Sequence, residues 1–183
     1  DMQINDIINN QNLKYEMKQL VASVGQSVGK QREHNEDSVL AITSTISGSA
    51  DSIPLGLYIV ADGMGGHQFG EVASNAAVRI MGGNITKKFH SYLYNLPTQA
   101  LQESLQEVME ASIMEAHQYV QREAPGSGTT VTAALVLGQQ VTIAHVGDSR
   151  AYSIYPDGRI EPITRDHSLV KRLEELGHLS KDE

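Results

Sequence analysis

Short apolar runs of strand length mark the first half of the chain. Residues 20–27, 38–46 and 55–61 are rich in aliphatic and β-branched side chains, and a Gly-Ser-Ala-Asp-Ser turn at 48–52 separates the last two. This pattern predicts three β-strands before any helix begins.

Two stretches with helical spacing follow. The first begins near Gly70, and Gly82-Gly83 is expected to weaken or interrupt it because glycine is a poor helix former. The second follows Pro97. Its apolar stripe consists of Leu101, Leu105, Val108, Met109, Ala116 and Val120. A stripe of this width on a Gln/Glu-rich segment is typical of a helix that lies on a sheet.

Strand-like runs return at 129–137, 141–146, 151–155 and 159–163, with turns at 138–140 and 156–158. They predict an antiparallel meander, and a last helical piece is expected at 168–176, ending at Gly177. Strands, then two helices, then hairpins indicate an α+β domain whose antiparallel sheet is covered by helices, because alternating βαβ units are absent.

The chain has 183 residues, which is enough for one domain with a sizeable core. Residues 1–18 are rich in Asn and Gln with isolated Ile, and we expect them to form a lead-in or linker before a domain at 19–183.

Charge and composition exclude several functions. The formal net charge is −8 with no basic cluster, so we expect neither nucleic acid nor an anionic membrane surface as a partner. The chain has no cysteine, which excludes disulfides, zinc-thiolate sites and cysteine nucleophiles. No signal pattern and no membrane-spanning apolar run is visible, and we expect a cytoplasmic protein.

Three polar clusters carry candidate chemistry. The first is Arg-Glu-His-Asn-Glu-Asp at 32–37, between two predicted strands. Carboxylates such as Glu36 and Asp37 suit Mg²⁺ or Mn²⁺, and the planar guanidinium of Arg32 suits phosphate. Taken alone, this loop is better explained as a solvated run of charges.

The second and third clusters share one design, in which a carboxylate follows an apolar run. Residues 57–61 lead into Asp62-Gly63-Met64-Gly65-Gly66-His67, and residues 141–146 lead into Gly147-Asp148-Ser149-Arg150. Glycines let the backbone approach a ligand closely. The alternatives are a capped glycine turn at the second cluster and a turn ion pair between Asp148 and Arg150 at the third.

Taken together, these motifs resemble the protein phosphatase 2C family of bacteria. The resemblance runs from about residue 20 to the end, in the family's order: Arg32, Glu36-Asp37, residues 60–67 and 70–74, Gly126-Ser127-Gly128-Thr129-Thr130, Gly147-Asp148-Ser149-Arg150 and Thr164-Arg165-Asp166-His167-Ser168. It implies two antiparallel β-sheets packed as a sandwich and flanked by helices, and metal-dependent hydrolysis of phosphoserine and phosphothreonine in proteins.

The resemblance also implies roles for individual residues. Asp62 matches the metal-bridging aspartate, and Gly63 matches the residue whose carbonyl binds one metal. Glu36 and Asp37 match acidic residues around the metal-bound waters. Arg32 matches the phosphate-binding arginine, and Asp148 matches an aspartate associated with a further, more loosely held metal.

The resemblance implies two Mg²⁺ or Mn²⁺ ions as cofactors, or three in the full-length parent, and a water that bridges two of them attacks phosphorus. The implied partners are phosphoprotein substrates of a Ser/Thr kinase. Met64 stands where eukaryotic members have a histidine, so the general acid is unassigned. Family members continue well past the position of Glu183 and bring two further aspartates to the metals.

The sequence also suggests three rival interpretations. Gly25-Gln26-Ser27-Val28-Gly29 matches the nucleophile elbow of serine hydrolases, but a charged loop follows it in place of a helix. The glycines of residues 63–70 lack the Gly-Lys-Ser/Thr of a P-loop. The third alternative is a non-catalytic phosphatase-like binding or regulatory module, because the C-terminal metal ligands are absent from this sequence.

Overall fold

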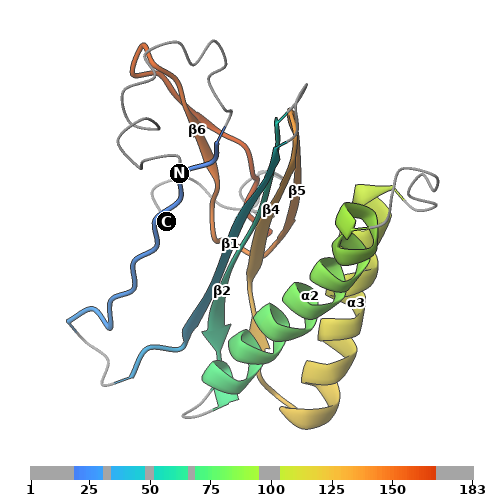
Figure 1. The fold of residues 1–183 in the computed structure, drawn as a ribbon. Coiled ribbons are helices and arrows are strands. Elements are labelled where there is room, and N and C mark those ends of the chain that lie inside the picture. The colour runs from blue at the N-terminus through green and yellow to red at the C-terminus, as the bar shows by residue number, and fades with distance from the viewer. Residues whose placement is uncertain (1–18, 31–33, 48–51, 66–68, 95–103, 168–183) are drawn as a thin grey trace, which may run out of the picture.

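The computed structural model describes residues 19–30, 34–47, 52–65, 69–94 and 104–167 (Figure 1). Four strands form the main antiparallel sheet in the order β1-β2-β4-β5. They are β1 (Asp37–Ser47), β2 (Ser52–Met64), β4 (Val131–Leu137) and β5 (Gln140–Val146). The short β3 (Gly128–Thr129) pairs with the end of β2, and β6 (Tyr152–Ile154) pairs with β7 (Ile160–Pro162) in a separate two-stranded sheet.

Two helices cover one face of the main sheet, as Figure 1 shows. They are α2 (Phe69–Tyr94) and α3 (Leu105–Glu123). Ser104 caps α3 in a capping box, in which its hydroxyl accepts from the Glu107 amide and the Glu107 carboxylate accepts from the Ser104 amide. This cap satisfies backbone donors that a helix end leaves without partners.

The core lies between the helices and the sheet. Alternate residues of β2 and β4 point toward the helices, and Ile59, Ala133 and Leu135 are completely buried there. They pack with Met81 of α2 and Met109 of α3 in one hydrophobic cluster. The inward-facing residues of the strands therefore pack against the apolar stripe of α3, as the sequence predicts.

The predicted fold class is confirmed: the domain is α+β with two antiparallel sheets. The strands expected at 38–46, 55–61 and 141–146 are present, with β2 longer than expected at both ends. The hairpins β4–β5 and β6–β7 are present too. They belong to different sheets, so the expected single meander is wrong.

Two further predictions are wrong. Residues 19–28 form no strand, and Val21 and Val24 are 97% and 60% exposed, because nothing described pairs with this segment. Helix α2 runs through Gly82-Gly83 without a break. A Cβ at Gly82 would lie 2.5 Å from Leu40 Cδ2, so this glycine lets the helix approach β1 closely.

Some predictions fall outside the described residues. These are the lead-in at 1–18, the turn residues 48–51, Leu101 and the helical piece at 168–176. Within the described part of the chain, no helix is long and apolar enough to span a bilayer.

Candidate functional site

The strand directions gather the candidate residues at one end of the main sheet. Neighbouring strands are antiparallel, so the start of β1, the end of β2, the start of β4 and the end of β5 share that end. Glu36-Asp37, Asp62-Gly63, Thr129-Thr130 and Gly147-Asp148 lie at those four positions. Segments that are far apart in the sequence therefore meet, as the motif pattern predicts.

Asp37 and Asp62 are directly opposite each other in the β1–β2 register. Opposed residues of an antiparallel pair point to the same face, and like charges in that position are destabilising. Ile59 and Ala61 are buried against the helices, so the alternation places Asp62 on the other face, where it is exposed. Two carboxylates held together on an open face are a suitable start for a divalent cation site.

Glu36 is attached to both β2 and α2 through its backbone. Its carbonyl oxygen accepts hydrogen bonds from the Gly63 amide at 3.2 Å and from the Ser74 hydroxyl at 2.6 Å. Ser74 is fully buried, and its hydroxyl also lies 3.0 Å from Ser38 Oγ. The side chain of Asn35 accepts from the Asp37 amide at 3.0 Å. The backbone that carries the two acidic residues is therefore well fixed.

Glycine is required where β2 meets the start of α2. A Cβ at Gly63 would lie 2.1 Å from the Gly70 carbonyl oxygen and 2.6 Å from that of Glu36. A Cβ at Gly70 would lie 3.2 Å from Glu36 Oε2, so this carboxylate sits beside the first turn of the helix. The positive end of the α2 dipole favours a negative charge there.

The turn that carries Asp148 is packed against the start of β4. Gly147 has a φ of 107°, and a Cβ on it would lie 2.7 Å from Thr130 Cγ2. Asp148 itself is exposed, and its neighbour Ser149 places Oγ 2.7 Å from Thr130 Oγ1. Because the same Thr130 hydroxyl accepts from the Asp62 amide at 3.0 Å, one side chain joins the two motifs.

Arg150 does not form the turn ion pair with Asp148 that was one alternative. It donates two hydrogen bonds to Asp166, from Nε at 2.9 Å and from Nη2 at 2.5 Å. These hydrogen bonds are the main cause that raises the pKa of Arg150. This pair connects residues 164–167 to the motif end of the main sheet, the end that carries Asp62 and Asp148. There the His167 amide also donates to the Gly147 carbonyl at 2.7 Å.

His145 continues this polar network along β5. Its Nδ1 lies 2.9 Å from the Thr132 hydroxyl and its Nε2 lies 3.0 Å from the Arg165 carbonyl oxygen. Its ring is 4.9 Å from that of His167. With both ring nitrogens engaged, His145 holds the returning segment against the sheet.

The predicted site is assembled only in part. The structure brings Asp37, Asp62 and the backbone of Glu36 and Gly63 together, and it places the Asp148 turn at the same end of the sheet. Arg32 lies outside the described residues. Among the described residues, no three His, Asp or Glu side chains are grouped closely enough to hold a metal ion. The donor types fit Mg²⁺ or Mn²⁺, and further ligands are needed to complete a site.

Sequence reasoning missed the supporting residues Ser74, Thr130 and Thr132. Ser74 and Thr130 are buried, with 0% and 3% of their surface exposed. A signal existed for Ser74, because it follows Ala73 on the buried stripe of a helix, where a hydroxyl requires a partner. Thr130 occurs in the quoted Gly-Ser-Gly-Thr-Thr motif, but spacing alone does not say which hydroxyl faces inward.

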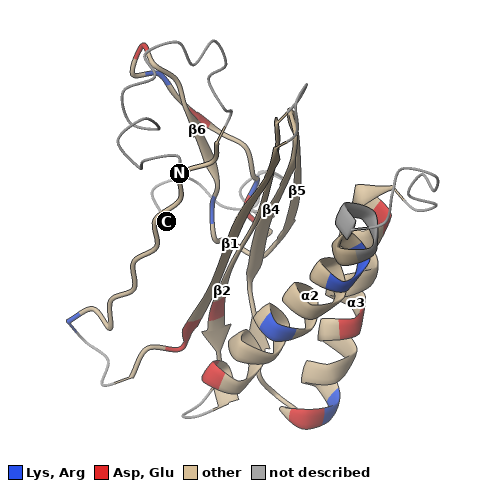
Figure 2. Ribbon diagram, in the orientation of Figure 1, with Lys and Arg blue, Asp and Glu red and all other residues tan. Residues whose placement is uncertain are grey.

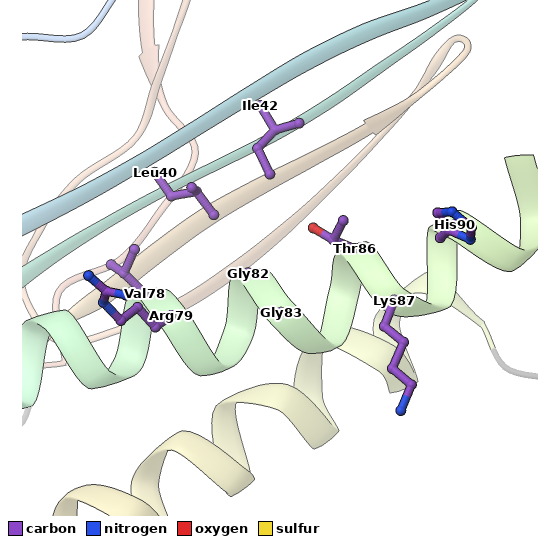
Figure 3. Close-up of a pocket in the computed structure, with 9 residues that line it drawn as sticks. All are labelled: Leu40, Ile42, Val78, Arg79, Gly82, Gly83, Thr86, Lys87 and His90. Atoms are coloured by element: carbon purple, nitrogen blue, oxygen red, sulfur yellow. The ribbon is translucent and has the colours of Figure 1, made fainter.

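A separate groove lies between β1 and α2 (Figure 3). It has a volume of about 600 Å³ and is lined by Leu40, Ile42, Val78, Arg79, Gly82, Gly83, Thr86, Lys87 and His90. Its residues come from the middle of β1 and of α2, so it is distinct from the carboxylate end of the sheet.

Comparison with known proteins decides the family. The model of the family described as Protein phosphatase 2C matches residues 21–176. The chain belongs to the protein phosphatase 2C family. The match begins and ends close to the limits expected from the motifs, and it includes all three polar clusters.

Curated relatives of this phosphatase 2C chain are bacterial enzymes. It is 38% identical over 156 residues to the serine/threonine phosphatase stp of Listeria innocua, covering 85% of this chain and 58% of that protein. It is 31% identical over 163 residues to the serine/threonine protein phosphatase PstP of Mycobacterium tuberculosis, covering 85% and 26%. The chain therefore spans 58% of the length of the Listeria relative.

Solved structures agree with this family membership. The Mycobacterium tuberculosis phosphatase PstP/Ppp matches with a TM-score of 0.58 and 29% identity, over 82% of this chain and 56% of that one. The catalytic domain of PstP in complex with two manganese ions matches with a TM-score of 0.59 and 30% identity, over 84% and 59%.

Proposed function

We propose that this chain is part of a Mg²⁺- or Mn²⁺-dependent protein serine/threonine phosphatase. The observation that carries the proposal is the Asp37–Asp62 pair, two carboxylates held opposite each other at the motif end of the sheet. Family membership and the manganese-bound PstP relative support the same activity. The substrates we propose are phosphoproteins modified by a Ser/Thr kinase.

In this proposal the residues divide the work by their chemistry. Asp62 and the carbonyl of Gly63 would hold the metal ions, and Glu36 and Asp37 would orient the water around them. Arg32 would bind the phosphate as a bidentate donor, and Asp148 would bind a further metal ion. When bound, two divalent ions supply Lewis acidity, lower the pKa of a water and stabilise the charge that develops on phosphate oxygens.

The close fit of Gly63 supports its proposed role. A side chain at this position would collide with backbone oxygens on two sides, so only glycine keeps its carbonyl in this position. Asp62 is fixed through its backbone, with Thr130 bonding both its amide and its carbonyl at 3.0 and 2.9 Å. Ligands on rigid strand ends meet metals with little loss of conformational entropy.

The test is hydrolysis of a phosphothreonine peptide across a Mn²⁺ titration, with Asp62→Asn as the variant and Asp157→Asn as the matched control. Asp157 is an exposed carboxylate in the β6–β7 turn, so its loss leaves turnover unchanged. In the longer parent protein we expect Mn²⁺-dependent turnover that Asp62→Asn abolishes. Turnover that survives in Asp62→Asn would refute the metal-binding role of this residue.

A partial chain requires a second arm of this test. The same assay is run on the longer parent protein with both variants. Turnover in the parent but not in the 183-residue chain shows that the remaining metal ligands come from outside it. A parent that binds Mn²⁺ and phosphopeptide without turnover contradicts the proposal and favours a binding module.

A further inference from the structure

The groove beside β1 lies along an edge of the main sheet. In the order β1-β2-β4-β5, β1 is an outer strand, and among the described residues no strand pairs with its outer edge. The described residues that line the groove come from β1 and α2, and none comes from β2. An occupant would therefore lie beside backbone groups of β1 that can receive another strand.

The floor of the groove is apolar and open. Leu40 and Ile42 project from β1 toward α2, as Figure 3 shows, and Val78 faces them from the helix. Gly83 is exposed in the interior of α2, and a Cβ on it would meet nothing within 4 Å. Glycine disfavours helix there, and no contact with a described residue explains it, in contrast to Gly82.

The charged residues of the groove are all basic. Among the residues that the structure describes, Arg79, Lys87 and His90 line it and no carboxylate does, although the whole chain carries a net charge of −8. Figure 2 shows the same bias along α2, whose one acidic residue, Glu71, lies in the first turn. In Figure 3 the Lys87 side chain turns away from β1, while Arg79 and His90 stand near opposite ends of the groove.

We propose that this groove binds an acidic, extended peptide segment of a partner protein, which adds a strand to the outer edge of β1. Alternate apolar side chains of the peptide fill the space over Gly83, and its carboxylates face Arg79 and the outer flank of α2. Main-chain hydrogen bonds supply affinity, and the basic flank selects an acidic sequence.

The probe is a short fluorescein-labelled peptide in which Glu alternates with Val, followed by fluorescence polarisation. The matched probe has Lys in place of Glu. Gly83→Leu fills the groove and Gln118→Leu adds the same side chain to an exposed position of α3. We expect Gly83→Leu to weaken binding about tenfold or more and to raise the Tm by about 2–4 °C, because it removes a helix-interior glycine.

Arg79→Glu is expected to weaken binding of the Glu peptide and to lower its salt dependence. The proposal is overturned if the Glu peptide does not bind, if the Lys peptide binds equally well, or if Gly83→Leu and Gln118→Leu behave alike. It is also overturned if vesicles of anionic phospholipid bind to the groove and the peptide does not.

A separate observation concerns Thr130. Its hydroxyl accepts from the Asp62 amide and contacts Ser149 Oγ, and its amide donates to the Asp62 carbonyl at 2.9 Å. Only 3% of the Thr130 surface is exposed, so water has little access to these hydrogen bonds. One buried side chain therefore connects the strand end of Asp62 with the turn that carries Asp148.

We infer that Thr130 is a positioning residue for the proposed metal site, an inference that rests on the proposed function. Thr130→Val keeps the shape of the side chain and removes its hydroxyl, whereas Thr130→Ser keeps the hydroxyl. We expect Thr130→Val to weaken Mn²⁺ binding about threefold to tenfold, as the loss of one or two hydrogen bonds implies. Thr130→Ser should restore most of the affinity.

Ser112→Ala is the matched control, because this buried hydroxyl donates to the Val108 carbonyl at 2.7 Å within α3. Mn²⁺ binding is measured by electron paramagnetic resonance of the unbound ion, on the full-length parent. Equal losses in Thr130→Val and Ser112→Ala would mean a general structural effect and would overturn the inference. Unchanged Mn²⁺ binding in Thr130→Val overturns only the inference about Thr130. A wild-type parent without Mn²⁺ affinity overturns the proposed function as well.

Discussion

The middle and the C-terminal end of β2 lie in contrasting surroundings. In its middle, Leu57 and Ile59 belong to the hydrophobic core, where apolar side chains of the helices and strands fill the available volume. Its end, at Asp62 and Gly63, is held by hydrogen bonds and by close backbone contacts that tolerate no added atom. The first region stabilises the fold, and the second holds carboxylates together at some cost in stability.

The largest expected effect on folding lies in the core. Leu135→Ala removes a completely buried side chain and should lower the free energy of unfolding by about 2–5 kcal/mol. Val136→Ala, on the opposite and half-buried face of β4, should cost much less. Urea unfolding followed by circular dichroism makes the comparison, and equal losses would contradict the one-sided core.

A smaller loss is expected where β2 meets α2. Gly63→Ala places a Cβ against two backbone oxygens, and the displacement of α2 should cost about 1–3 kcal/mol. Gly83→Ala, in open space, should instead stabilise the protein by about 1 kcal/mol. Thermal unfolding of both variants separates a steric requirement from a general intolerance of alanine.

The cap of α3 should contribute less again. Ser104→Ala removes the hydroxyl that accepts from the Glu107 amide and should cost about 1 kcal/mol. Hydrogen bonds from the Ser104 amide lower the pKa of Glu107 below its ordinary value of 4.5. This contribution to stability is therefore complete above pH 4.5 and is lost as the pH falls through the folded-state pKa. For Glu107→Gln, the midpoint of urea unfolding should no longer show the fall with acid that comes from this carboxylate.

The smallest effect should have the opposite sign. Asp37→Asn removes the repulsion with Asp62, and with a chelator present it should stabilise the chain by about 0.2–1 kcal/mol. Under saturating Mn²⁺ the wild type should regain this difference, because the ion binds the folded state. A variant that is less stable than the wild type in chelator would show that the carboxylates do not repel each other.

The sequence predicted the apolar framework better than the polar support. Alternation in β2 and the stripe of α3 identify core residues because burial leaves a periodic trace. The predicted interruption of α2 at Gly82-Gly83 is wrong. Gly82 is present because the helix lies close to Leu40 of β1, a contact between two elements that helix propensity does not reveal. The run at 20–27 has strand composition, but a strand also requires a partner, which composition does not reveal.

The candidate site shows the same division. Motif order indicated that Glu36-Asp37, Asp62 and Asp148 belong together, and strand direction now places them at one end of the sheet. The hydroxyls of Ser74 and Thr130 were not predicted, because their partners lie far away in the sequence. Hydrogen bonds of this kind depend on register, which single residues do not determine.

The most direct test is Mn²⁺ binding to the full-length parent, measured by electron paramagnetic resonance for the wild type, Asp62→Asn and Asp157→Asn. We expect saturable binding to the wild type and to Asp157→Asn, and its loss in Asp62→Asn. Equal binding by all three proteins would contradict the claim that the carboxylate end of the sheet is a metal site.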